Sequence, residues 1–170
     1  ASVSIKNSLK ETRQKILSSL AELLLKNVDS IIKENEKDLA KMKDTDPKKD
    51  RLLLNENRIK DLANSLHDVI KLEDPTGKVL SYTISENGLQ IQKITVPIGV
   101  VGVIYEARPN VTIDVAALCL YAGNAVVLRG GSDAEFTNQI LADIIHQALK
   151  ENNIDENVVQ LLPVDRKFVK

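Results

Sequence analysis

The chain has 170 residues, of which 43% are hydrophobic and 28% charged, and its 23 basic and 24 acidic residues leave a net charge of -1. This composition is typical of one folded domain with a sizeable core and excludes a disordered chain. The balanced charge gives no overall field for nucleic acid or an anionic membrane, and no apolar run is long enough to span a bilayer. We therefore expect a cytoplasmic protein that binds neither nucleic acid nor membranes.

The first part of the chain is predicted to be helical. Apolar residues at helical spacing predict helices around residues 16–24 and 31–39, and a more regular helix over 59–70. Asn55 stands in front of the third helix and is a typical N-cap. Residues 41–50 alternate charges around a proline, so we interpret them as an exposed, solvated connection.

A turn at residues 74–77 leads into a predicted β-hairpin over 78–96. Its apolar residues alternate with polar ones on both sides of Asn87-Gly88, a pair typical of a type I′ turn. The alternation then changes phase, which predicts a β-bulge near Gln92-Lys93. A two-stranded hairpin is marginal in isolation, so either the chain's own helices or a second copy of the protein should cover it.

The remainder predicts a βαβαβ unit with right-handed crossovers. The expected order is strand, helix, strand, helix, strand over residues 98–105, 111–121, 124–128, 133–150 and 158–162. The run 99–104 is continuously apolar, as in a strand buried on both faces of a parallel sheet, and residues 124–128 predict a second buried strand. The sequence thus predicts an α/β fold, an incomplete Rossmann-type parallel sheet preceded by a helical segment (1–77) and a hairpin (78–96).

Residues 105–110 follow the first of these strands and form a polar loop. Loops at the carboxyl ends of parallel strands are where such sheets bind ligands. The amide of Asn110 is a suitable hydrogen-bond donor for an oxyanion, or else it caps the next helix. Arg108 can bind a carboxylate or phosphate with two hydrogen bonds, or else it forms an ion pair with Glu106 that braces the loop.

A second turn, Arg129-Gly130-Gly131-Ser132, follows the next strand. Its glycines allow close approach of a ligand to the backbone, and Ser132 with Glu135 has the spacing of a capping box. The N–H groups of a helix start suit phosphate, and Arg129 adds a fixed cation. The alternative is a capped helix with Arg129 on the surface. The G-x-G-x-x-G fingerprint is absent, because Gly99 and Gly102 lie inside the predicted strand.

The single cysteine, Cys119, excludes an internal disulfide and any multi-cysteine metal site. It stands in an apolar helix with no neighbouring cation or histidine, so we interpret it as structural and not as a nucleophile. His67 and His146 lack a second ligand at metal-site spacing and are also interpreted as structural. No metal site is predicted.

The motifs YEARPNVT-x-D and GNAVVLRGG, with Pro97-x-Gly99-Val100 and LEDP-x-G at residues 72–77, resemble the gamma-glutamyl phosphate reductases. These glutamate-5-semialdehyde dehydrogenases belong to the aldehyde dehydrogenase superfamily. The resemblance extends over essentially the whole chain and is strongest over residues 72–131. It implies an aldehyde dehydrogenase-like fold and NADPH-dependent reduction of L-glutamyl 5-phosphate to L-glutamate 5-semialdehyde in proline biosynthesis, with this chain as the amino-terminal, cofactor-binding part.

The resemblance also implies roles for individual residues. Asn110 would stabilise the oxyanion, Arg108 would bind substrate, and the cofactor would contact Tyr105, Glu106, Arg129, Gly130, Gly131 and Ser132. NADPH is expected over NADH, because Ser132 stands where NAD-selective members often carry an acid. The hairpin implies a homo-oligomer, and a glutamate 5-kinase is a possible partner.

Family members are much longer, and their nucleophilic cysteine lies in a later region, so we expect these 170 residues alone to be inactive. Two alternatives stay open. One is an NAD(P)-dependent aldehyde dehydrogenase for another aldehyde, against which the extended polar EARPN loop argues. The other is a noncatalytic nucleotide-binding or assembly module, which a nucleophilic cysteine further along the sequence would exclude.

Overall fold

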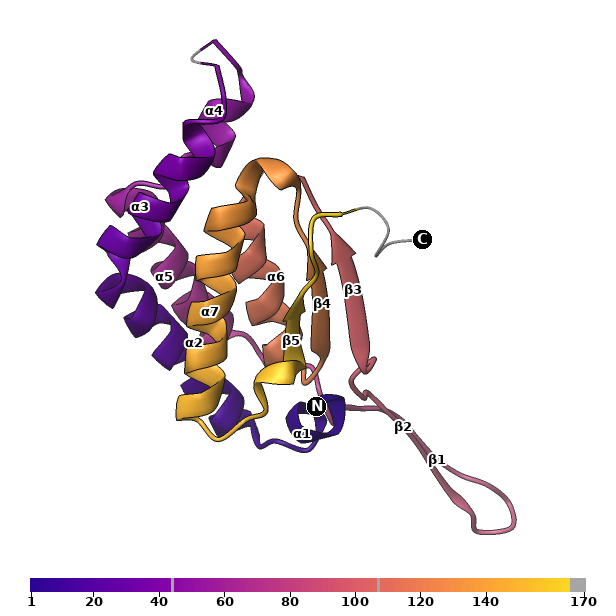
Figure 1. Cartoon of the computed structure of the whole chain (residues 1–170). Coiled ribbons are helices and arrows are strands. Elements are labelled where there is room, and N and C mark those ends of the chain that lie inside the picture. The colour runs from indigo at the N-terminus through magenta and orange to yellow at the C-terminus, as the bar shows by residue number, and fades with distance from the viewer. Residues whose placement is uncertain (44, 107, 166–170) are drawn as a thin grey trace.

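The structure is a computed structural model that describes residues 1–43, 45–106 and 108–165, so Ala107 of the polar loop lies outside the described residues. A parallel sheet with strand order β3-β4-β5 forms one layer of the molecule (Figure 1). Its strands and crossover helices are β3 (Val100–Ile104), α6 (Asn110–Tyr121), β4 (Ala125–Arg129), α7 (Glu135–Glu151) and β5 (Val159–Leu161). The predicted βαβαβ unit and α/β fold are confirmed.

Both crossover helices lie on the same face of the sheet, because the strand order advances in one direction and parallel crossovers are right-handed (Figure 1). The prediction that residues 99–104 are buried on both faces is therefore wrong: Val100 and Ile104 of β3 are 57% and 63% exposed. No helix in the described ranges covers their side of the sheet. For β4 the prediction of a buried strand is confirmed, since Val126 and Leu128 are completely buried and Ala125 is 4% exposed.

The first part of the chain forms a third layer over α6 and α7 (Figure 1). Its helices are α1 (Ser2–Lys6), α2 (Lys10–Lys26), α3 (Val28–Leu39), α4 (Lys48–Leu52) and α5 (Glu56–Lys71). α2 packs on α5, α6 and α7, and α3 packs on α7. The three predicted helices are confirmed, whereas α1 and α4 were not predicted. α4 begins inside residues 41–50, so that segment is more than a solvated connection.

The helical layer follows the apolar periodicity of the sequence. Ile16, Leu20 and Leu24 of α2 are completely buried, and burying a side chain of this size contributes roughly 1.5–3 kcal/mol. Asn55 caps α5 as predicted, since its Oδ1 accepts the backbone N–H of Arg58 at 2.9 Å. None of the described helices is both long enough and apolar enough to cross a membrane.

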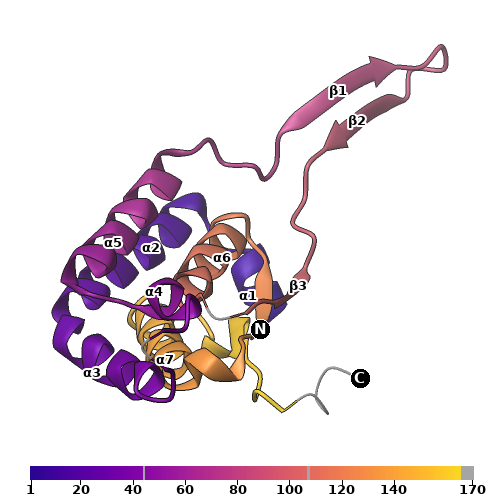
Figure 2. The ribbon, with the colours of Figure 1, turned by 90° about the horizontal axis from the view of Figure 1, so that it is seen from above.

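The hairpin of β1 (Val79–Ile84) and β2 (Gln90–Ile94) projects away from the layers (Figures 1 and 2). Every residue of both strands is exposed, so the alternative in which it packs on the chain's own helices is wrong. The predicted bulge lies at the expected place along the hairpin, but the extra residue is Leu80 of β1, opposite Lys93 and Ile94.

The predicted type I′ turn at Asn87-Gly88 is also wrong. Gly88 has a φ of +83°, but Asn87 is not among the residues with positive φ. Gly88 N–H donates to the Ser85 carbonyl at 2.8 Å, and Ser85 N–H donates to the Leu89 carbonyl at 2.9 Å. A longer loop thus closes the hairpin, with one glycine in the left-handed region, as in turns built on a type I core.

An ion pair fixes the hairpin to the helical layer. Arg13 of α2 is only 3% exposed, and its Nη2 lies 2.5 Å from Asp74 Oδ2. Asp74 Oδ1 accepts the N–H and the hydroxyl of Thr76 at 2.9 and 2.8 Å. Burial raises the pKa of Asp74, but the Thr76 donors and the Arg13 guanidinium together hold that pKa below its usual value.

Candidate functional site

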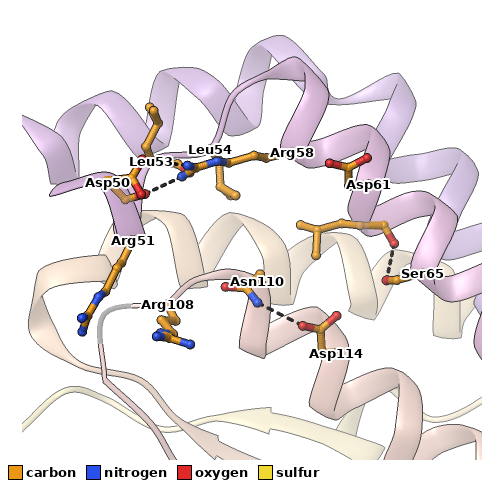
Figure 3. A pocket seen from close by; sticks show the side chains of 11 residues that line it. Asp50, Arg51, Leu53, Leu54, Arg58, Asp61, Ser65, Arg108, Asn110 and Asp114 are labelled. Atoms are coloured by element: carbon orange, nitrogen blue, oxygen red, sulfur yellow. Dashed lines mark hydrogen bonds and ion pairs between the residues drawn. The ribbon is translucent and has the colours of Figure 1, made fainter. Parts of the chain in front are cut away.

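Three cavities follow one another along the loop between β3 and α6, at the carboxyl end of the sheet. The first, here called the α5 cavity, has a volume of about 430 Å³ and lies between α4, α5 and the start of α6 (Figure 3). The residues used below from its lining are Arg51, Arg58, Asp61, Arg108, Asn110 and Asp114. Its size is within the range of small-molecule sites.

The other two cavities continue from the first. The neck, of about 50 Å³, is lined by Lys48, Arg51, Glu106 and Arg108. The β4 cavity, of about 420 Å³, has a lining that includes Lys48, Tyr105, Glu106, Arg129, Gly131 and Ser132. Because the neck shares two residues with each larger cavity, it lies between them. Most of the residues predicted for the site are therefore brought together around one loop.

Asn110 is the first residue of α6, and Pro109 before it occupies the N-cap position. The alternative that Asn110 caps this helix is therefore wrong. Its Nδ2 donates to Asp114 Oδ2 at 3.1 Å, one turn further on (Figure 3). An amide carries two N–H donors and one acceptor, so within the described chain Asn110 keeps one N–H and its carbonyl free for a ligand.

Asp114 is half-buried and accepts this one hydrogen bond. Burial raises the pKa of its carboxyl group more than the N–H of Asn110 lowers it. No cation from the described ranges lies within ion-pair distance of Asp114. A negative charge in the α5 cavity is thus compensated by a single neutral donor.

The arginines of the α5 cavity differ in whether they already form hydrogen bonds or ion pairs within the protein. Arg58 donates to the Leu53 carbonyl at 2.8 Å and pairs with Asp50 Oδ1 at 2.7 Å, so it braces the end of α4. The guanidinium groups of Arg51 and Arg108 have no partner in the part of the chain that the structure describes. The alternative that Arg108 pairs with Glu106 is wrong, because only their backbones are bonded, with Arg108 N–H 2.9 Å from the Glu106 carbonyl.

Tyr105 fixes the start of the loop to the helices beneath it. Its hydroxyl lies 2.6 Å from Thr112 Oγ1, and the Thr112 hydroxyl donates to Asn138 Oδ1 at 2.9 Å. Burial raises the pKa of the Tyr105 hydroxyl more than the Thr112 bond lowers it, so the phenol stays protonated at neutral pH. Tyr105 can therefore line the β4 cavity but is not a base.

Gly130 has a packing role. A Cβ atom at this position would lie 2.1 Å from Asn138 Nδ2, so only glycine lets the end of β4 approach α7 this closely. Gly130 is buried and lines a separate, smaller cavity with Asn138. Gly131 and Ser132, in contrast, line the β4 cavity.

The predicted capping box of Ser132 and Glu135 is wrong. Residues 132–134 form a short 3₁₀ turn, and no side chain of this turn caps α7. Instead the buried carboxylate of Asp38, from α3, accepts the N–H of Thr137 at 2.8 Å and its hydroxyl at 2.7 Å. The amino end of α7 is thus occupied by the protein's own anion, which leaves it unsuited to bind phosphate.

Arg129 is half-buried and belongs to the β4 cavity, not to the open surface. Its Nη2 donates to the Val164 carbonyl at 2.5 Å, whereas its Nε is buried and has no partner within the described chain. The same lining holds a second cation, Lys48, together with the hydroxyl of Ser132 and the carboxylates of Glu106 and Asp133. An orphaned guanidinium N–H in a polar cavity fits a phosphorylated nucleotide.

Residues 4–170 match the aldehyde dehydrogenase family. The chain belongs to this family. Among curated relatives, gamma-glutamyl phosphate reductases of Legionella pneumophila (strain Paris) and Bacteroides fragilis (strain YCH46) are 49% and 47% identical over 94% and 89% of the chain. These alignments cover 38% and 37% of the relatives' own lengths, so the chain spans less than two-fifths of them.

Solved structures of the family are similar to this chain. The gamma-glutamyl phosphate reductase of Thermotoga maritima superposes with a TM-score of 0.94 and 37% identity over 99% of this chain and 42% of that one. The enzyme of Saccharomyces cerevisiae gives a TM-score of 0.86 with 31% identity over 95% of this chain and 43% of that one. The resemblance found in the sequence is confirmed, and a nicotinamide nucleotide is the cofactor type of this aldehyde dehydrogenase family.

The contributions of α4 and α5 to the site were not predicted from the sequence. Lys48 and Arg51 belong to the segment interpreted as a solvated connection, and nothing local distinguishes them. A signal did exist for Asp61, because Arg58, Asp61 and Ser65 recur at helical spacing beside the apolar face of α5, and all three line the α5 cavity.

Two other residues match their structural interpretation. Cys119 is half-buried against the core, and burial raises the pKa of its thiol, which disfavours the reactive thiolate. His146 lies within 2.8 Å of the Val159 carbonyl through its Nε2, so it joins α7 to β5.

Proposed function

We propose that this chain forms the cofactor- and substrate-binding part of a gamma-glutamyl phosphate reductase, which reduces L-glutamyl 5-phosphate to L-glutamate 5-semialdehyde with NADPH in proline biosynthesis. The observation that carries the proposal is the amide of Asn110. It has a spare N–H, lies at the carboxyl end of β3, and faces a charged cavity next to a second cavity fit for a nucleotide.

Each residue of the loop then has a defined task. Asn110 donates its free N–H to the oxyanion that develops on the acyl oxygen when the acyl carbon is attacked. Arg108, exposed beside the neck, binds the anionic phosphoryl or carboxylate group with its planar guanidinium. The loop is held in place by the Tyr105–Thr112–Asn138 hydrogen bonds, so the two groups act from a fixed backbone.

The β4 cavity is the proposed nucleotide site. Bound there, a nicotinamide dinucleotide supplies the hydride for the reduction. Arg129 and Lys48 place positive charge where a 2′-phosphate would enter, and Ser132 adds a hydroxyl without negative charge, which favours NADPH over NADH. Tyr105, Glu106 and Gly131 form the remaining wall, while Gly130 contributes through the packing of β4 on α7.

The covalent step of the reaction needs a thiolate, which Cys119 is not suited to provide. We infer that the nucleophilic cysteine comes from outside residues 1–170. Cys119→Ser should accordingly leave kcat unchanged in a complete enzyme that carries this chain, and the isolated chain should not turn over. Turnover by the isolated chain that Cys119→Ser abolishes would contradict both statements.

The deciding experiment is run in the reverse direction on a complete enzyme that includes this chain. Glutamate 5-semialdehyde and NADP⁺ are supplied with and without inorganic phosphate, and NADPH formation is followed together with hydroxamate formation from trapped acyl phosphate. Phosphate-dependent production of both supports the proposal. Oxidation independent of phosphate would indicate an aldehyde dehydrogenase that releases free acid. Nucleotide binding without turnover of any aldehyde would indicate a noncatalytic module.

Assembly and location are part of the same proposal. The exposed apolar side chains of the hairpin, among them Leu80, Tyr82 and Ile84, support a homo-oligomer in which β1 and β2 pack on another copy. A glutamate 5-kinase is the proposed partner, because acyl phosphates hydrolyse readily in water. We propose the cytoplasm as the location.

A further inference from the structure

Apart from the ion pair of Asp50 and Arg58, the α5 cavity separates its charges along its length. Figure 3 shows the side chains of Arg51 and Arg108 toward one end and those of Asp61 and Asp114 toward the other, with Asn110 between them. The arginine end is the end that opens into the neck. A ligand with an anionic group at one end and a cationic group at the other would match this arrangement.

We propose that Asp114 and Asp61 bind the positively charged α-amino group of the substrate, and that they thereby select an amino-acid acyl phosphate over the same compound without its amino group. This inference rests on the function proposed above. It assigns substrate specificity to two carboxylates that line the cavity from different helices, Asp61 from α5 and Asp114 from α6 (Figure 3).

The position of Asp114 beside the oxyanion donor provides the first argument. Its Oδ2 lies 3.1 Å from Asn110 Nδ2, the group proposed to stabilise developing negative charge. A carboxylate so close opposes that charge, because like charges a few ångströms apart repel, and more strongly where burial reduces the screening by water. A substrate ammonium group on Asp114 neutralises the carboxylate at the moment the oxyanion forms, so recognition and catalysis become linked.

The second argument is that no cation of the described chain pairs with either carboxylate. Arg58, which lies on the same helix as Asp61 and lines the same cavity, is already engaged by Asp50 and the Leu53 carbonyl. Asp61 has no hydrogen bond or ion pair to any residue the structure describes, and burial raises the pKa of Asp114. A half-buried carboxylate that has only one neutral donor, as Asp114 does, is costly, and that cost is offset when a ligand brings the opposite charge.

The competing explanation is that Asp114 only orients the Asn110 amide. Then every substrate would depend on Asp114 to the same degree, whether or not it has an amino group. Under the proposal, only substrates that carry an ammonium group gain from it. The two explanations therefore differ in how a variant changes the ratio of two substrates, which a purely structural role does not alter.

The experiment compares glutamate 5-semialdehyde with 5-oxopentanoate, which lacks only the amino group, in a complete enzyme with NADP⁺ and phosphate. The variants are Asp114→Asn and Asp61→Asn, which keep side-chain size and remove the charge. Asp68→Asn is the matched control, because Asp68 is on the same helix as Asp61 and pairs with exposed Lys71. Melting temperatures establish that each variant folds.

We expect the wild-type preference for glutamate 5-semialdehyde, measured as the ratio of kcat/KM values, to narrow by roughly 10- to 100-fold in Asp114→Asn. Asp61→Asn should narrow it less, because Asp61 is exposed, and Asp68→Asn should not change it. Equal losses for both substrates in Asp114→Asn, with no change of ratio in Asp61→Asn, would overturn the inference while the proposed function stands. If the wild type fails to oxidise glutamate 5-semialdehyde with phosphate, the proposed function fails and this inference falls with it.

Discussion

Two asparagine–aspartate pairs on different helices differ in how many hydrogen bonds they make within the protein. On α3, Asn35 donates to the Leu52 carbonyl at 2.9 Å and to Thr137 Oγ1 at 3.1 Å, and it accepts the Leu54 N–H at 2.8 Å. Asp38, one turn further on, is also fully buried and accepts backbone and hydroxyl donors from α7. Almost every polar atom of this pair is thus used to join α3, α4 and α7.

On α6, Asn110 and Asp114 share one hydrogen bond, and their other polar atoms face the α5 cavity. The residue types and their spacing are nearly the same as on α3, so type and spacing do not decide the role. The number of hydrogen bonds already made within the protein does. A buried polar group with all its partners stabilises the fold, whereas one with spare capacity can bind a ligand.

The largest effect should come from the pair with spare capacity. Asn110→Ala in a complete enzyme should lower kcat by roughly 10²–10³, the usual loss for one oxyanion donor, and should change the NADPH dissociation constant little. Because Asn110 does not cap α6, the melting temperature should stay near that of the wild type. Steady-state kinetics and thermal unfolding test this together. A lower melting temperature with normal kcat would make Asn110 a scaffold residue like Asn35.

The opposite pattern is expected at Asn35. Asn35→Ala leaves the Leu54 N–H and the Leu52 carbonyl buried without partners, which should reduce the free energy of unfolding by about 3 kcal/mol. kcat per folded molecule should not change. Urea denaturation measures the loss, and Asn64→Ala on the exposed side of α5 is the control. A variant with unchanged stability and reduced kcat would contradict the structural role assigned to Asn35.

Arg129 combines the two kinds of group, with one nitrogen bonded to Val164 and another left without a partner. Arg129→Ala in a complete enzyme should therefore weaken NADPH binding by roughly 10-fold, equivalent to about 1.4 kcal/mol, and NADH binding less. Fluorescence titration with both nucleotides measures the difference. Equal losses for the two nucleotides would mean that Arg129 serves the scaffold or a part of the cofactor that both share.

The sequence was a good guide where a residue follows its own strand or helix. Asn110 and Arg108 could be placed at the carboxyl end of β3 because that position follows directly from a strand–loop–helix pattern. The exposed face of β3 could not be predicted, because an apolar run does not show whether a helix covers both faces of the strand. The helix start at α7 was misread for the same reason: its cap is Asp38, some 99 residues earlier.

The same limit applies to the α5 cavity. Asp61 and Arg51 reach it only because α4 and α5 pack near the start of α6, which is a tertiary contact between segments about 50 residues apart. Helical periodicity shows that Asp61 lies off the apolar face of α5, but not which neighbour it meets.

The smallest effect is expected far from the cavities, at the ion pair between Arg13 and Asp74. The folded-state pKa of Asp74 lies below its ordinary value, so the pair stabilises the fold above about pH 4, the pKa of an unfolded aspartate, and the stabilisation is lost as pH falls through the lower, folded-state pKa. Asp74→Asn should lower the free energy of unfolding by about 1 kcal/mol at pH 7, since the side chain is partly exposed, and by less in acid. Urea denaturation at a series of pH values measures both. Like Asn35, Asp74 has its partners inside the protein, so its loss should leave kcat unchanged. An equal loss of stability at every pH would show that the Thr76 hydrogen bonds, and not the charge on Asp74, fix the turn at residues 74–77 that leads into the hairpin.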